Sequence, residues 1–281
     1  MSILQLPHAR PDVILIDWHA TLVDTHDAMY HAVDDVLPKL RELGLYEQLL
    51  PPEQSKTVED AKLVKYVREH AQLHPRITSE RKISRTDIFE VLFGDDQDAK
   101  ARAHKAFDNS YRKYVGEVHS LEPDTREQLQ RLRKLGVILG VISNRNREFM
   151  EHELQMVDDE GWADLFDTMV CGTDVDRRKP APDLLLEALQ RLGRPVDESC
   201  WYVGDSTTDI IAAKEAGITA IFYNGAGWDA HWIDKIFPGT HRHPHRPDAV
   251  VPSMAELVEL ARRMLAQDKR VHRYRDHEPA R

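Results

Sequence analysis

The stretch Val13–Asp17 reads VILID, an apolar and mostly β-branched run that ends abruptly in an acid. A run without polar residues is typical of a strand that is buried on both faces, as in a parallel sheet. Five further runs have the same character, and we expect each to be a strand of the same sheet: Val137–Ile142, Asp167–Cys171, Cys200–Val203, Thr219–Tyr223 and Ala249–Val251.

Segments with helical spacing of their apolar residues lie between these runs. Leucines recur at three-residue steps in residues 125–135 and 182–192, and residues 209–216 are rich in alanine and end before a glycine. Strands that alternate with helices of this length form right-handed βαβ units, with helices on both faces of a parallel sheet. The sequence therefore predicts a doubly wound, Rossmann-like α/β core.

The span from residue 25 to residue 118 interrupts this alternation. It shows no convincing strand pattern, and its apolar spacing predicts helices over residues 28–43, 58–73, 84–93 and 98–114. We therefore expect an α/β core made of residues 1–24 and 119–266, with an all-helical cap domain, residues 25–118, inserted after the first strand. The charged remainder, residues 267–281, is predicted to be a mobile tail.

The composition excludes several classes of protein. The chain has 281 residues, of which 41% are hydrophobic, and a formal charge of −10, which favours a globular protein without a nucleic-acid partner. No run approaches the roughly 18 apolar residues that cross a bilayer, and the N-terminus does not resemble a secretory signal. Cys171 and Cys200 lie among apolar residues, which predicts reduced thiols in a cytoplasmic protein. We expect a monomer or a homodimer.

Chemically active residue types follow four of the predicted strands. In open parallel sheets, functional side chains gather at the carboxyl ends of the strands. We therefore expect one rim of the sheet to carry the following residues: Asp17, Ser143, Asn144, Lys179, Asp205 and Asp209.

These residue types point to phosphoryl chemistry. The carboxylates of Asp17, Asp205 and Asp209 are hard oxygen ligands that suit Mg²⁺, and a carboxylate can also attack phosphorus to form an aspartyl-phosphate. Ser143 could hydrogen-bond a phosphoryl group, and the Lys179 ammonium could offset the crowded acids. Each residue taken singly could instead be a turn or a helix cap, but their order along the chain favours a shared site.

The four segments, in this order, resemble the four motifs of the haloacid dehalogenase superfamily. The resemblance covers about residues 13–265, and the helical insert is similar to that family's C1 cap, with the phosphoglycolate-phosphatase-like members closest in appearance. It implies an Mg²⁺-dependent hydrolase that acts on a small phosphorylated metabolite through an aspartyl-phosphate.

The same resemblance implies roles for the matching residues. Asp17 would be the nucleophile, and Mg²⁺ would be bound by Asp17, the backbone carbonyl of His19, Asp205 and Asp209. The substrate would be bound by Thr21, Ser143, Asn144 and Lys179.

One position departs from the family pattern. Phosphatases of this family usually carry a second aspartate two residues after the nucleophile, as general acid and base, but this chain has His19 there. An imidazole has an ordinary pKa of about 6.5 and could do this work, so His19 is a catalytic candidate. The competing interpretation is a neutral side chain that fills the place of a lost proton donor.

Two other functions therefore stay open. Phosphonate-cleaving members also have a tryptophan after the nucleophile, as Trp18 is here, and lack the second acid, but they need a cap lysine to form a Schiff base. A chain that has lost catalysis could instead bind a phosphorylated ligand or a partner protein without turnover.

Two features lie outside these motifs. His241, His243 and His245 could bind a transition metal, although their alternation with arginine and proline favours a solvated loop. Trp228 and Trp232 follow the fifth strand and could line the entrance to the site, although packing is the simpler interpretation.

Overall fold

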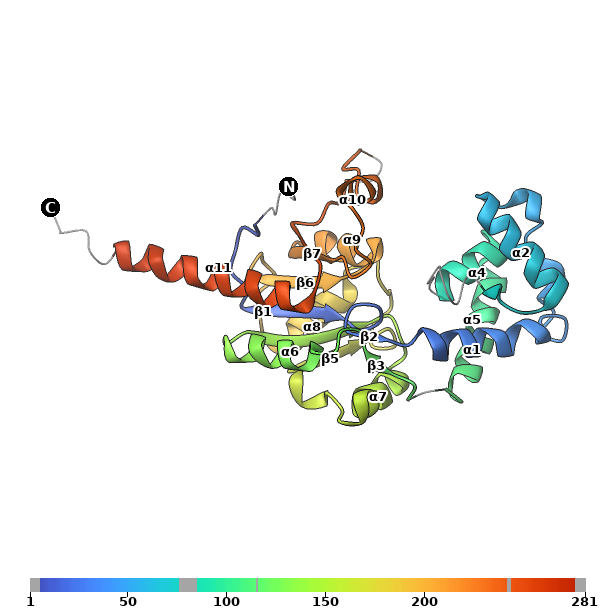
Figure 1. Cartoon of the computed structure of the whole chain (residues 1–281), viewed down its shortest axis with the longest axis horizontal. Coiled ribbons are helices and arrows are strands. Elements are labelled where there is room, and N and C mark those ends of the chain that lie inside the picture. Colours follow the sequence, from blue (N-terminus) through green and yellow to red (C-terminus); the bar gives the residue numbers. More distant parts are fainter. Residues whose placement is uncertain (1–5, 76–84, 115, 242–243, 276–281) are drawn as a thin grey trace. The chain divides into compact units, whose positions relative to one another are not determined.

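The computed structural model describes residues 6–75, 85–114, 116–241 and 244–275 (Figure 1). The chain divides into two compact units. One comprises the segment up to Asp24 together with the segment from His119 onward, and the other is Thr25–Val118. No helix within the described ranges is both long and apolar enough to cross a membrane.

The first unit is built on a parallel sheet of six strands, in the order β5-β4-β1-β6-β7-β8. All six predicted strands are confirmed, and their ends lie within one residue of the prediction. Strand β1 has neighbours on both sides and is buried along its whole length, which explains its uninterrupted apolar run. The bounds are β1 Val13–Asp17, β4 Ile138–Ser143, β5 Thr168–Cys171, β6 Cys200–Gly204, β7 Thr219–Tyr223 and β8 Ala249–Val251.

Helices cover both faces of this sheet, as predicted. Helices α8 and α9 share one buried cluster with Val13 and Leu15 of β1. Helices α6 and α11 pack against each other and contribute no residue to that cluster, as expected for the opposite face. The helices of this unit are α6 Thr125–Lys134, α7 Arg147–Met156, α8 Asp183–Leu192, α9 Thr207–Ala216, α10 Ala230–Ile236 and α11 Met254–Arg275.

Helix α11 extends into the segment that was predicted to be a mobile tail. The tail was predicted from residue 267, the helix continues through Arg275, and residues 276–281 lie outside the described ranges, so the mobility of this segment stays a prediction. Earlier in the helix, Glu259 accepts hydrogen bonds from Arg262 (2.8 Å) and Arg263 (2.7 Å), which lie three and four residues further on. Such pairs stabilise an exposed helix, so a charged composition does not exclude one.

The second unit is all-helical within its described residues. Four helices are observed where four were predicted, although Ser84, the predicted start of the third, lies outside the described residues. The first ends at Val36 rather than at residue 43, because Pro38 lacks the N–H that would continue it. The bounds are α1 His26–Val36, α2 Val58–His70, α4 Arg85–Phe93 and α5 Gln97–Tyr111.

The chain leaves and re-enters the first unit through a short antiparallel pair. Strand β2 (Val23–Asp24) pairs with β3 (His119–Ser120), and Leu121 N donates to Leu22 O at 2.9 Å. The two crossing points are therefore held together by backbone hydrogen bonds within the first unit.

The aromatic core of the second unit yields a stability prediction. Phe107 is 1% exposed and stacks on Tyr111 with a centroid distance of 5.4 Å. Replacing Phe107→Ala should lower the free energy of unfolding of this unit by about 3–5 kcal/mol, because it leaves a cavity. Urea unfolding followed by residue-specific hydrogen exchange measures this. The control is Val58→Ala, at a side chain that is 66% exposed. A loss no larger than the control's would contradict the packing described.

Candidate active site

Three strand ends meet at one rim of the sheet. Strand β1 ends at Asp17, which pairs with Ile142 of β4, and Ile16 pairs with Val203 of β6. The strand order reverses at β1, and this switch point is where open α/β sheets bind ligands. Asp205 follows β6 directly, so the structure brings the predicted acids to the predicted place.

A buried ammonium lies at the centre of this rim. Lys179 Nζ donates to Asp17 Oδ1 at 2.6 Å, to Asp209 Oδ1 at 2.7 Å and to the Tyr202 hydroxyl at 2.9 Å. The Tyr202 hydroxyl donates to Asp209 Oδ1 at 2.9 Å. Burial alone lowers the pKa of Lys179, but the carboxylates of Asp17 and Asp209 outweigh it and raise that pKa above its ordinary value. Lys179 is therefore a permanent positive charge in this site.

Asp209 is held in place by the start of helix α9. The Ser206 backbone N–H donates to Asp209 Oδ2 at 3.1 Å, and the Asp209 N–H donates to Ser206 Oγ at 3.4 Å, which together form a capping box. The carboxylate lies so close to Gly204 that a Cβ there would be 2.4 Å from Asp209 Cγ. Only glycine fits at this strand end.

The carboxylates of Asp17, Asp205 and Asp209 form one cluster. Each offers an oxygen, and these oxygens lie within 4.8 Å of one another. Burial raises the pKa of Asp17 to about 7, because it outweighs the opposing effect of Lys179. Burial, together with the neighbouring charges of Asp209 and Asp17, raises the pKa of Asp205 to about 8. The cluster thus resists full ionisation.

This donor set fits a hard divalent cation. Three ionised carboxylates and one ammonium leave a formal charge of −3 + 1 = −2 in a largely buried space. A divalent ion with a preference for oxygen, such as Mg²⁺, matches both the charge and the ligand type.

Two residues predicted to bind substrate make other contacts. Thr21 is fully buried, and its hydroxyl donates to Asp205 Oδ1 at 3.1 Å. The side-chain amide of Asn144 makes two hydrogen bonds with the backbone of Lys179. Its Nδ2 donates to the Lys179 carbonyl at 3.0 Å, and its Oδ1 accepts from the Lys179 N–H at 2.8 Å. In this structure both side chains fix the residues of the acid and lysine cluster.

His19 belongs to a second group, in which Glu153 is fully buried and the side chain of His19 is 23% exposed. His19 Nε2 lies 3.1 Å from Glu153 Oε2, and its Nδ1 lies 3.5 Å from Ser143 Oγ. Trp18 Nε1 donates to the same Glu153 oxygen at 2.8 Å, and Arg145 Nη1 lies 3.3 Å from Glu153 Oε1. Burial and the charge of Arg145 lower the pKa of His19 to about 4 against the opposing effect of Glu153, so the ring is neutral near pH 7.

The sequence did not identify Glu153 or Tyr202 as site residues. Tyr202 sits inside the apolar run of β6, where an aromatic is read as core. Glu153 is an acid on the buried face of α7, next to Phe149, Met150 and Leu154. An acid at an apolar helical position is a signal that could have been used, because a buried carboxylate needs partners.

Among the residues that the structure describes, the features outside the motifs form no cluster of metal-binding side chains. His245 pairs with Glu215 at 3.1 Å, and His243 lies outside the described residues. Trp228 is 42% exposed and stacks on Phe222, and Trp232 is 50% exposed. Cys171 and Cys200 are buried and unbonded to each other, as predicted.

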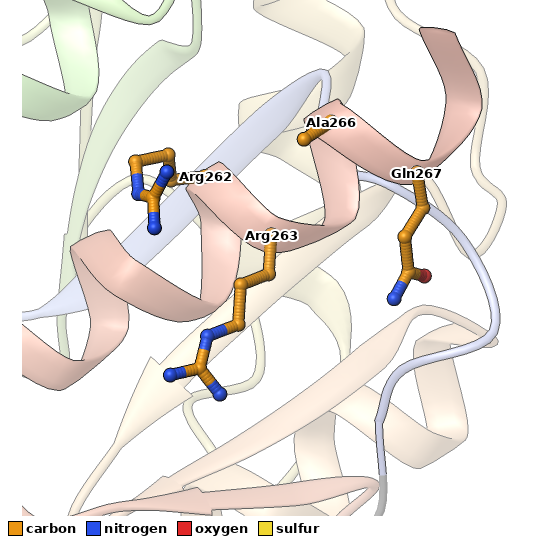
Figure 2. Close-up of a pocket in the computed structure, with 4 residues that line it drawn as sticks. All are labelled: Arg262, Arg263, Ala266 and Gln267. Carbon is orange, nitrogen blue, oxygen red and sulfur yellow. The ribbon is translucent and has the colours of Figure 1, made fainter. Parts of the chain in front are cut away.

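A surface hollow on helix α11 does not contribute to the rim. Figure 2 shows its lining residues, and two of them, Arg262 and Arg263, are already paired with Glu259. None of the residues lining the hollow belongs to the acid cluster or to the group of His19 and Glu153.

Comparisons with known proteins identify the family of the chain and agree with its fold. A family model described as haloacid dehalogenase-like hydrolase matches residues 14–223. The phosphoglycolate phosphatase of Neisseria meningitidis is 32% identical over 177 residues, covering 61% of this chain and 71% of that protein. That of Escherichia coli is 28% identical over 216 residues, covering 74% and 79%. A crystal structure of a predicted phosphoglycolate phosphatase from Haemophilus somnus superimposes with a TM-score of 0.57 at 18% identity, covering 92% and 99%.

The raised pKa values predict how stability depends on pH and on the metal. In the unfolded chain both carboxyl groups have a pKa near 3.8, whereas in the folded protein the pKa is about 7 for Asp17 and about 8 for Asp205. At pH values between these limits, the folded protein therefore binds more protons than the unfolded chain. The contribution of the two acids to the stability of metal-free protein therefore falls as pH rises through this range. Mg²⁺ needs the ionised acids, so it should raise the melting temperature more at about pH 8.5 than at about pH 6. Thermal unfolding with EDTA or Mg²⁺ measures this, and equal stabilisation at both pH values would contradict the assignment.

Proposed function

The chain belongs to the haloacid dehalogenase-like hydrolase family, and we propose that it is an Mg²⁺-dependent phosphatase that hydrolyses a small phosphomonoester through an aspartyl-phosphate on Asp17. The observation that carries this proposal is the cluster of Asp17, Lys179 and Asp209 at the switch point of the sheet. A carboxylate beside a permanent ammonium can approach a phosphate that the acids alone would repel.

In the first step, an Asp17 oxygen attacks the phosphorus. The bond from phosphorus to the ester oxygen breaks, and that oxygen leaves with the electron pair and takes up a proton from solvent. Lys179 offsets negative charge beside the reacting carboxylate, and Ser143, at the end of β4, would hydrogen-bond the phosphoryl oxygens. A bound Mg²⁺ would supply further neutralisation of the phosphoryl charge.

In the second step, water attacks the same phosphorus and the bond to Asp17 breaks, which restores the carboxylate. The water proton must be accepted, and His19 is the candidate, because its pKa of about 4 leaves the ring neutral near pH 7. A neutral ring accepts a proton more readily than it donates one, so the structure favours His19 in this step over protonation of the leaving oxygen.

The substrate class follows from the relatives. Curated relatives are named phosphoglycolate phosphatases, so 2-phosphoglycolate and other small phosphomonoesters are the first compounds to test. A panel of phosphorylated metabolites ranks the candidates by kcat/KM.

The phosphonate alternative finds little support in the cap lysines. All of them that the structure describes are exposed except Lys100, and Lys100 donates to Glu90 at 2.7 Å. Lys82 lies outside the described residues. The alternative without turnover is tested by the assay below, because a binding protein would hold Mg²⁺ and release no phosphate.

The nucleophile assignment predicts the effect of Asp17→Asn. Turnover of p-nitrophenyl phosphate with Mg²⁺ should fall by on the order of 10³-fold or more, because the amide cannot form the phosphoryl intermediate. The fold should survive, since the amide oxygen can still accept from Lys179. Activity that persists in the variant, or wild-type activity that is unchanged by EDTA, would contradict the proposal.

The His19 assignment predicts a dependence on the leaving group. Wild type should cleave p-nitrophenyl phosphate, whose leaving group needs little protonation, better than alkyl phosphates. His19→Asp should raise the relative rate with alkyl phosphates, and His19→Ala should lower both rates. If neither substitution changes turnover, His19 is a space-filling residue.

A further inference from the structure

The carboxylate of Glu153 is buried beneath His19. Its side chain has no exposed surface, although its helix, α7, presents polar residues to solvent on the other face. Burying a carboxylate is costly unless partners compensate, so its contacts identify what holds it there.

The side chains of Trp18, His19 and Arg145 approach this carboxylate. Oε2 accepts from Trp18 Nε1 at 2.8 Å and faces His19 Nε2 at 3.1 Å, while Oε1 lies 3.3 Å from Arg145 Nη1. Arg145 is always charged, so it favours the ionised form of Glu153. An ionised carboxylate only accepts hydrogen bonds, and therefore the hydrogen of the His19 ring belongs on Nε2.

This assignment leaves Nδ1 as the basic atom of the neutral ring. Nδ1 faces Ser143 Oγ at 3.5 Å, and Ser143 stands at the end of β4, beside Asp17 on β1. Ser143 Oγ already accepts from the Arg145 backbone N–H at 3.1 Å, so its own hydrogen can point toward Nδ1. The ring thus turns its lone pair toward the reaction site and its N–H toward the core.

We propose that Glu153 is a positioning residue for the phosphatase reaction and that it fixes the tautomer and the orientation of the His19 ring. The proposal rests on the proposed function, because the reaction is what the ring is positioned for. In this role Glu153 acts on the reaction through His19. If Glu153 had only a structural role, its contacts with Trp18 and Arg145 would explain that role, and His19 would not be needed for it.

The tautomer can be read without any turnover. Two-bond ¹H–¹⁵N spectra of histidine-labelled protein, with His19 assigned by difference from His19→Ala, should show the Nε2–H tautomer in wild type. Glu153→Gln keeps the side-chain volume but adds a donor toward Nε2, so the tautomer should become mixed. The matched control is Glu151→Gln on the exposed face of the same helix, where the wild-type pattern should remain. An Nδ1–H tautomer in wild type, or no change in Glu153→Gln, overturns the proposal.

A double-mutant cycle separates positioning from structure. Glu153→Gln should lower kcat for p-nitrophenyl phosphate by about 10- to 100-fold in wild type, and by less than about twofold in the His19→Ala background. Equal factors in both backgrounds mean a structural role and overturn the proposal. If Glu153→Gln does not fold, Glu153→Asp keeps the charge beside Arg145 but shortens the reach to Nε2, and should lower kcat in the same direction. A wild type without phosphatase activity refutes the proposed function instead, and the tautomer spectra still decide the role of Glu153.

Discussion

The buried ammonium of Lys179 is the group on which the rim depends. Its contacts to Asp17, Asp209 and Tyr202 connect the end of β1, the first turn of α9, strand β6 and the loop before α8. Two ionised carboxylates in a buried space repel each other, and the ammonium of Lys179 between Asp17 and Asp209 offsets this repulsion. The same contact that stabilises the rim also prepares Asp17 for an encounter with phosphate.

The segment Asp17–His19 divides its three side chains among three environments. Asp17 enters the acid and lysine cluster, and Trp18 enters the core, where it packs edge-on against Trp162 with a centroid distance of 5.8 Å. His19 turns toward Glu153. The tryptophan is therefore accounted for by packing and by its hydrogen bond to Glu153. The acid cluster and the Glu153 group meet at this one segment, so its backbone fixes their spacing.

The sequence was sufficient for the sheet and for the acids, and insufficient for their partners. Strands such as β1 were predictable because burial on both faces demands an unbroken apolar run, and Asp17 and Asp205 because they end such runs. Glu153 was not predictable, because its partner His19 lies 134 residues away and only the tertiary fold joins them. The contacts of Asn144 with the Lys179 backbone could not be predicted for the same reason. Local sequence patterns also did not show that helix α11 continues through Arg275.

The most direct test of the account is to locate the phosphoryl group during turnover. The enzyme is mixed with Mg²⁺ and a cleaved phosphomonoester, quenched in acid within the steady state, digested and analysed by mass spectrometry. The account predicts an acid-stable, base-labile phosphoryl group on the peptide that contains Asp17. Turnover that leaves no phosphoryl group on the protein, or leaves it on another residue, would contradict it.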